Sequence, residues 1–481
     1  MTSPARGAAV AASPARRADT EPLPWTSALW TGCDVALLRV RGHAREADRL
    51  LSASLAAQPD HPDLLRLGGD GPLAACRLEE SLEHPGRALA KSADAKRSGY
   101  QIATVLAALR RDEACRRLLA PALRRAEPGA MAYGRWLLGC LEGFGSRRWD
   151  RALRVVLPGL AAEDPYPPLV GLAAVAYSRL GRAAEGRTVV ERIRRDGPAG
   201  AEVAVALSRL RRDSGDGAGA LAELGRLTRG YGLAELRTPD ADGRLAIGRL
   251  AAKPVPAVDG GPLVSVIMTI HRWHTHSAVA IGSILAQSWR RLELIVVDDA
   301  STDATPGRLA ALARRDSRLR VLRLPCNVGT YAAKNIGLGV ARGELVTCMD
   351  SDDWSHPNRL EAQVKILVSR PELFATSGSY MRVSIRGEIG LHRPYRRALV
   401  TMMFRREPML ERLGAYDSVR ASGDSELLWR ARAAFGDAAV HESPALMLVA
   451  ADDPSSLTGG GPFAIGWRGR ALPRVRYRAG Y

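Results

Sequence analysis

Apolar residues recur every three to four positions between about residues 25 and 252, as they do at Ala47, Leu50, Leu51 and Leu55. This spacing predicts amphipathic helices, each with one apolar face. Glycine and proline separate the segments, and three of the helix starts, near residues 151, 185 and 219, follow one another at steps of 34 residues. We therefore expect an all-helical region built from similar units.

The pattern changes after a stretch rich in proline and glycine at residues 253–262. Short apolar runs at 263–269, 292–297, 318–324 and 344–349 then alternate with helix-like segments. Such alternation predicts a mostly parallel sheet with helices on both faces. We expect an α/β domain over residues 263–450, preceded by a disordered arm (1–24), the all-α domain (25–252) and a linker (253–262), and followed by a C-terminal tail (451–481).

The helical region resembles degenerate tetratricopeptide repeats, most visibly at residues 44–65, where the sequence between two helical segments reads Gln-Pro-Asp-His-Pro. Most of the aromatic and glycine positions of that repeat are missing, so a plain helical bundle is the alternative. Both versions imply a surface for packing or for a protein partner, and neither implies a catalytic centre.

The net charge of +18 is not by itself an indication of function. Arginine supplies 64 of the 69 basic residues, and no zinc-finger spacing or aromatic RNA-binding motif accompanies it, so we expect no nucleic-acid partner. The six cysteines form no C-x-x-C pair. No stretch reaches the roughly 20 apolar residues that cross a bilayer, which predicts a cytoplasmic protein with at most peripheral contact at the inner membrane face.

Acidic residues follow two of the predicted strands. Asp298, Asp299 and Asp303 come after one, and Asp350 and Asp352 come after another. Either cluster alone is explained by helix capping and solvated charge. Two clusters at equivalent strand ends favour a cation between them, because crowded carboxylates repel one another, and oxygen ligands suit Mn²⁺ or Mg²⁺.

Several motifs together resemble the family 2 glycosyltransferases, in that family's order and over about residues 263–436. They are 264–269 (VSVIMT), 283–289 (SILAQSW), 298–303 (DDASTD), 327–329 (NVG), 333–337 (AKNIG) and 350–353 (DSDD). The resemblance implies a GT-A fold, a nucleotide-diphosphate sugar donor, most simply a UDP-sugar, and inversion at the anomeric carbon. It further implies a glycan or lipid-linked acceptor in the synthesis of cell-surface polysaccharide or glycoconjugate.

The resemblance also implies roles for single residues. The nucleotide-binding set comprises Thr269, Asp298, Asp299, Lys334 and Asp350. Asp352 ends the family's D-x-D element and is the expected metal ligand, with Asp350 as a second. Lys334 stands where the family often has arginine.

A general base must take the proton of the acceptor hydroxyl as that hydroxyl attacks. Asp424 matches the acid of the family's Glu-Asp pair, although Gly423 replaces the preceding Glu. Asp424 is also a plausible cap of the following helix, and Glu426 is the alternative base.

Two aromatic side chains follow the second acidic cluster. Trp354 and His356 would contact the sugar or acceptor, or would be a core residue and a loop residue. The sequence leaves these two interpretations equal.

Two other functions compete with glycosyl transfer. A sugar-1-phosphate nucleotidyltransferase also combines a parallel sheet with acidic metal ligands, but residues 269–273 contain none of the glycines that such an enzyme has after its first strand. The other alternative is a non-catalytic adaptor with a degenerate transferase fold. The retained set of aspartates argues against it.

Overall fold

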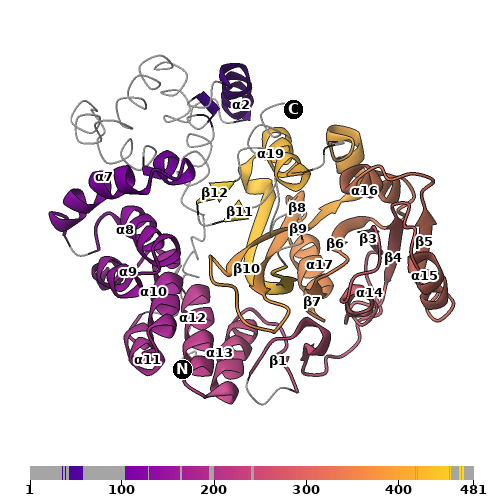
Figure 1. The fold of residues 1–481 in the computed structure, drawn as a ribbon. Helices are drawn as coiled ribbons and strands as arrows, with labels where there is room; N and C mark the ends of the chain where they lie inside the picture. Colours follow the sequence, from indigo (N-terminus) through magenta and orange to yellow (C-terminus); the bar gives the residue numbers. More distant parts are fainter. Residues whose placement is uncertain are drawn as a thin grey trace, which may run out of the picture.

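The computed structural model describes residues 43–57, 103–127, 129–162, 165–193, 200–239, 243–417 and 421–453, with a few isolated positions beside these ranges. In Figure 1 a group of helices lies alongside an α/β part that contains the large sheet. The predicted arm at residues 1–24 and most of the predicted tail at 451–481 lie outside the described residues.

The first part of the described chain is helical, as the apolar spacing predicts. Its α-helices are α2 (Ala44–Ala57), α7 (Asp112–Arg124), α8 (Ala132–Cys140), α9 (Trp149–Val156), α10 (Pro167–Arg179), α11 (Ala183–Glu191), α12 (Gly200–Asp213) and α13 (Gly217–Gly230), with short η1 (Leu141–Gly145) and η2 (Leu157–Ala161). The helices α9, α11 and α13 begin at steps of 34 residues. The step agrees with the spacing read from the sequence, and the tetratricopeptide-like character stays a prediction.

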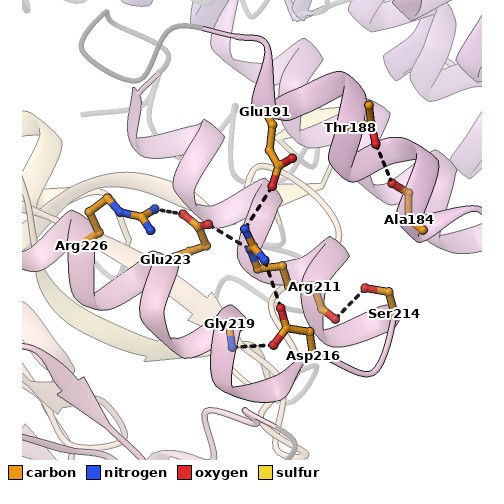
Figure 2. A network of polar contacts seen from close by, with 9 residues as sticks. All are labelled: Ala184, Thr188, Glu191, Arg211, Ser214, Asp216, Gly219, Glu223 and Arg226. Carbon is orange, nitrogen blue, oxygen red and sulfur yellow. Dashed lines mark hydrogen bonds and ion pairs between the residues drawn. The ribbon is translucent and has the colours of Figure 1, made fainter.

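Arg211 of α12 ties three of these helices together (Figure 2). Its guanidinium contacts Glu191 of α11, Asp216 at the start of α13 and Glu223 within α13, each at 3.0 Å. The Glu223 side chain is only 2% exposed, and Arg226 also contacts it. A carboxylate that far from water is stable only with such partners, so the network fixes the order of α11, α12 and α13.

The helical pattern ends earlier than the sequence suggests. The last helix, α13, stops at Gly230, and Gly232 follows with φ of +73°, a conformation that glycine adopts without strain. The chain then forms two short antiparallel strands, β1 (Leu236–Arg237) and β2 (Ala251–Ala252), with η3 (Ile247–Arg249) between them. Five apolar side chains of this segment are buried: Leu233, Leu236, Leu245, Ile247 and Leu250.

The α/β part contains an eight-stranded mixed sheet with the order β5-β4-β3-β6-β9-β8-β10-β7. Its strands are β3 (Val264–Ile270), β4 (Leu292–Asp298), β5 (Leu319–Arg323), β6 (Leu345–Asp350), β7 (Trp354–Ser355), β8 (Ala375–Val383), β9 (Tyr395–Arg405) and β10 (Val440–Ala451). The four strands β5, β4, β3 and β6 are parallel, whereas β9 and β7 run antiparallel to their neighbours. The expected fold class, an α/β domain behind a helical region, is confirmed.

Helices cover both faces of this sheet. One face packs on α14 (Ser277–Leu285), α15 (Thr305–Ala313) and α17 (Arg359–Ser369), and the other on α16 (Thr330–Gly339) and α19 (Gly423–Phe435). Side chains alternate along β3, with Val266 and Met268 in the first core and Ile267 in the second. Short α18 (Arg406–Pro408), η4 (Met409–Leu413) and η5 (Asp437–Ala439) complete this part.

A third hydrophobic core joins the helical region to the sheet. It contains Ala201 of α12 and Leu224 of α13 together with Met381 of β8 and Leu446 of β10. The buried Arg209 of α12 also donates to the backbone carbonyls of Ile389 and Gly390 in the β8–β9 loop. The two parts of the described chain therefore share one interior. No helix among the described residues is long and apolar enough to span a bilayer.

Candidate active site

The register of the parallel strands brings the first predicted site residues to one edge of the sheet. Asp298 of β4 pairs with Ile270 of β3, and Asp350 of β6 pairs with Thr269 of β3. Both acidic clusters therefore flank the end of β3, at the carboxyl edge where open α/β sheets bind ligands. The Thr269 hydroxyl lies 2.8 Å from the Thr330 hydroxyl at the start of α16.

The two aspartates at the end of β4 hold the loops beside them. One oxygen of the fully buried Asp298 accepts from the Ser301 amide at 3.0 Å. The two oxygens of Asp299 accept from the amides of Val328 and Gly329 at 2.8 and 2.9 Å. Asp299 thus fixes the loop that leads into α16.

The second acidic cluster is electrostatically crowded. Protein atoms surround the Asp350 carboxylate, although 47% of its side-chain surface stays open to solvent. This burial raises the pKa of Asp350 to about 6; Lys334 opposes the shift, and Asp352 adds to it. Burial also raises the pKa of Asp352 and of Asp353, and Asp353 accepts a hydrogen bond from the Ala451 amide at 3.0 Å.

Lys334 lies between the second cluster and the predicted base. Its ammonium is 3.9 Å from Asp350 and 3.5 Å from Asp424, and its side chain is 2% exposed. Burial by itself lowers the pKa of Lys334, but Asp424 and the other acidic groups nearby outweigh it and raise that pKa well above the usual value. Lys334 therefore stays charged and links two carboxylates that lie far apart in the sequence.

Asp424 is the second residue of α19 and is held by two groups of α16. Lys334 faces its Oδ1 atom, and the Tyr331 hydroxyl donates to its Oδ2 atom at 3.1 Å. The Asp424 side chain keeps 21% of its surface exposed. Ser422, the residue before the helix, has a left-handed conformation, and its side chain makes no capping hydrogen bond.

Trp354 and His356 lie inside the protein. Trp354 is 5% exposed and belongs to the core shared with the helical region. The His356 ring nitrogens contact the Ala234 carbonyl at 2.9 Å and the Asn358 amide at 3.2 Å. Burial lowers the pKa of His356 to about 4, so its ring is neutral. These contacts favour the structural interpretation of both residues over contact with a sugar.

Glu426, the alternative base, is bound elsewhere. Both of its oxygens contact the Arg430 guanidinium one turn further along α19, at 2.6 Å each. A bidentate pair of this kind fixes the carboxylate and stabilises its charge. Glu426 is therefore held within its own helix, whereas Asp424 contacts Tyr331 and Lys334 of α16.

Comparison with known proteins identifies this part of the chain. Residues 265–424 match the family model described as Glycosyl transferase family 2. These residues form a family 2 glycosyltransferase domain. The matched range contains β3, β4, β6 and α16, and it ends at Asp424.

Two curated relatives resemble parts of the glycosyltransferase domain. An uncharacterized glycosyltransferase of Haemophilus influenzae is 35% identical over 126 residues, which is 26% of this chain and 50% of that protein. The succinoglycan biosynthesis protein ExoO of Rhizobium meliloti is 39% identical over 110 residues, 23% of this chain and 31% of the relative. The chain thus spans half or less of the length of these curated relatives.

One solved structure shares a similar region. The mannosyltransferase PcManGT from Pyrobaculum calidifontis, solved with GDP-Man and Mn²⁺, is 23% identical and has a TM-score of 0.33. The similarity covers 42% of this chain and 61% of that one.

The acidic residues at the end of β6 fit a divalent cation that is held only partly by the protein. Among the described residues, no three or more His, Cys, Asp or Glu side chains converge as a metal site. Asp350 and Asp352 supply two carboxylates, and burial raises the pKa of each. Mg²⁺ is commonly held by one or two carboxylates plus substrate phosphates. The residues present therefore fit a cation that a diphosphate helps to bind.

Sequence reasoning missed two contributors to the site. Tyr331 is one, and the backbone amides of Val328 and Gly329 are the other. Tyr331 lies three residues before Lys334, so both point from one face of α16, and that spacing was the available signal. Backbone amides carry no sequence signal beyond the Gly329 position.

Proposed function

We propose that this chain is an inverting glycosyltransferase that moves a sugar from a nucleotide-diphosphate donor to an acceptor hydroxyl. The observation that carries the proposal is the contact of Lys334 with both Asp350 and Asp424. The donor side and the base side of a displacement reaction must lie a few ångströms apart, on opposite sides of the anomeric carbon. Lys334 contacts Asp350 on the donor side and Asp424 on the base side, so these two carboxylates lie close enough for such a reaction.

Each residue has a part in the proposed reaction. Thr269, Asp298 and Asp299 would border the nucleotide, and Asp350 and Asp352 would hold Mn²⁺ or Mg²⁺ together with the donor diphosphate. Such a cation would offset charge on the leaving diphosphate. Asp424 accepts the proton of the acceptor hydroxyl while the new bond from that oxygen to the anomeric carbon forms and the bond to the diphosphate breaks. The nucleoside diphosphate leaves with the bonding electron pair.

The biological setting is also a proposal. The relative ExoO is named for succinoglycan biosynthesis, which supports a role in making cell-surface polysaccharide. The acceptor would then be a glycan or a lipid-linked glycan that the enzyme meets at the inner membrane face. The helical region is available for a protein partner.

A donor screen tests the donor and the metal. The purified chain is melted with UDP-, GDP- and dTDP-sugars, with a CMP-sugar as the monophosphate control, in Mn²⁺, Mg²⁺ or EDTA. We expect one diphosphate donor, most simply a UDP-sugar, to raise the melting temperature only with metal and to release its nucleotide slowly. A shift that survives EDTA would contradict the metal, and no shift with any donor would contradict the donor class.

Two matched substitutions in α19 test the base. Asp424→Asn should retain the donor-induced shift in melting temperature and lose turnover by at least about a hundredfold, because an amide cannot accept the proton. Glu426→Gln should keep turnover within about threefold, since only its contact with Arg430 is lost. Turnover at the wild-type rate in Asp424→Asn would refute the assignment.

A further inference from the structure

Tyr331 is the one neutral side chain that hydrogen-bonds to Asp424 among the described residues. It is 6% exposed, and its ring lies 5.7 Å from the Tyr416 ring in the core beneath α16 and α19. The Lys334 ammonium sits 5.0 Å from the centre of the Tyr331 ring. The ring is thus fixed on two sides, and its hydroxyl has a set direction.

The hydroxyl can only act as a donor to the carboxylate. Burial and the charge of Asp424 raise the pKa of Tyr331 well above its usual value, so it remains protonated. A fixed donor restricts where the Asp424 carboxylate points. It also leaves a second lone pair on Oδ2, whereas Oδ1 is buried beside Lys334.

Gly423, directly before Asp424, provides the space that the Tyr331 ring occupies. A Cβ atom at position 423 would lie 2.8 Å from Cδ1 and 2.9 Å from Cγ of Tyr331. These atoms are at the root of the ring, where the side chain cannot swing aside. Gly423 has no left-handed backbone conformation that would by itself call for glycine. Space for the ring therefore explains why glycine stands where the resembling family has Glu.

We propose that Tyr331 is a positioning residue for Asp424, and that Gly423 and Tyr331 form a matched pair in which the glycine leaves room for the ring. The inference rests on the proposed function, because it takes Asp424 as the base. It adds a group on α16 that orients the carboxylate toward the acceptor. Lys334 holds one oxygen of the carboxylate and Tyr331 holds the other.

The test compares two tyrosines whose rings lie side by side. Tyr331→Phe removes the hydroxyl that contacts Asp424, and Tyr416→Phe removes one that lies 3.4 Å from the Cys348 sulfur. We expect Tyr331→Phe to lower kcat about tenfold to a hundredfold, because the variant loses a hydrogen bond to the charged group that takes the proton. The donor KM should stay within about twofold, because the lost hydrogen bond does not involve the donor. Tyr416→Phe should keep kcat within about twofold.

The matched pair is tested by a double-substitution cycle. Gly423→Ala should reduce kcat in the wild-type background, because its methyl group displaces the Tyr331 ring, and should cause little further loss in a Tyr331→Ala background. Equal losses in both backgrounds would overturn the pairing. Donor-induced shifts in melting temperature confirm that each variant is folded.

The results for Asp424→Asn and Tyr331→Phe distinguish a failure of the positioning role from a failure of the proposed function. If Asp424→Asn is inactive and Tyr331→Phe turns over like wild type, only the positioning role fails. If Asp424→Asn turns over like wild type, the base assignment fails and takes the positioning role with it. Support requires an inactive Asp424→Asn together with a slow Tyr331→Phe whose donor KM is unchanged.

Discussion

Single residues in this site serve structure and chemistry at once. Asp299 lies where nucleotide binding is expected, yet both of its oxygens also hold backbone amides of the loop before α16. The sequence singled out Asp299 and Asp350 because they follow strands, and Asp424 because it matches the acid of the family's Glu-Asp pair. Tyr331 was not predicted, because a tyrosine in a helix is ordinarily a core residue and its partner Asp424 is 93 positions away. Its role depends on the fold.

Replacing Asp299 with asparagine should weaken the fold as well as the site. An amide group can accept from only one of the two backbone N–H groups and turns its own N–H₂ toward the other. We expect the free energy of unfolding to fall by about 1–3 kcal/mol. Urea denaturation measures it, with the exposed Asp259→Asn as control. Equal stability of the two variants would show that the loop does not need this carboxylate.

His356 should make the stability depend on pH. Its pKa is about 4 in the folded protein and about 6.5 in the unfolded chain, so between these values only the unfolded chain binds a proton. The contribution of the neutral His356 ring to stability is therefore present in full above about pH 6.5 and is lost as the pH falls toward 4. From about pH 7 to about pH 5 this one group should remove roughly 2 kcal/mol. His356→Gln should reduce that slope in urea titrations, and an unchanged slope would contradict the prediction.

Among the helices and strands, the sequence predicted best those whose pattern lies within their own residues. The strands expected at residues 263–269, 292–297, 318–324 and 344–349 match β3, β4, β5 and β6 to within two residues. Each is a short run rich in apolar residues, and helices separate these runs along the chain. The antiparallel strand β9 was not predicted, because its place beside β6 depends on pairing between residues about 60 positions apart. The short pair β1–β2 escaped for a similar reason.

The contact of α12 with the β8–β9 loop should be costly to remove. Arg209 is buried, and its guanidinium satisfies two backbone carbonyls that have no other partner described. Arg209→Met keeps the apolar stem and leaves these carbonyls unpaired, so we expect a loss of about 2–4 kcal/mol in the free energy of unfolding. The matched control, Arg154→Met, changes a side chain that is 68% exposed and should lose less than about 0.5 kcal/mol.

At the scale of the whole molecule, α12 and α13 share a hydrophobic core with the sheet. Composition and periodicity predicted a helical part and an α/β part, with a boundary at 253–262. Neither could reveal that Leu224 and Met381 pack in one cluster, since the two lie more than 150 positions apart. The positions of the parts relative to each other follow from side-chain complementarity, which a hydrophobic pattern does not encode.

The shared core predicts coincident unfolding of both parts. Thermal melts followed by circular dichroism, which reports mainly the helices, and by tryptophan fluorescence, to which the core residue Trp354 contributes, should have the same midpoint. Leu224→Ala in α13 should lower both midpoints together, with a loss of about 2–5 kcal/mol. Two separated transitions, or a shift confined to one signal, would show that the parts are independent.

The shared core also bears on how such an enzyme can change over generations. Proteins whose parts touch lightly can exchange a whole part by recombination and remain folded. Here a transplanted helical segment would have to bring side chains that fit Met381, Leu446 and the carbonyls at Ile389 and Gly390. New properties would therefore arise more readily by gradual substitution within both parts than by exchange of one of them.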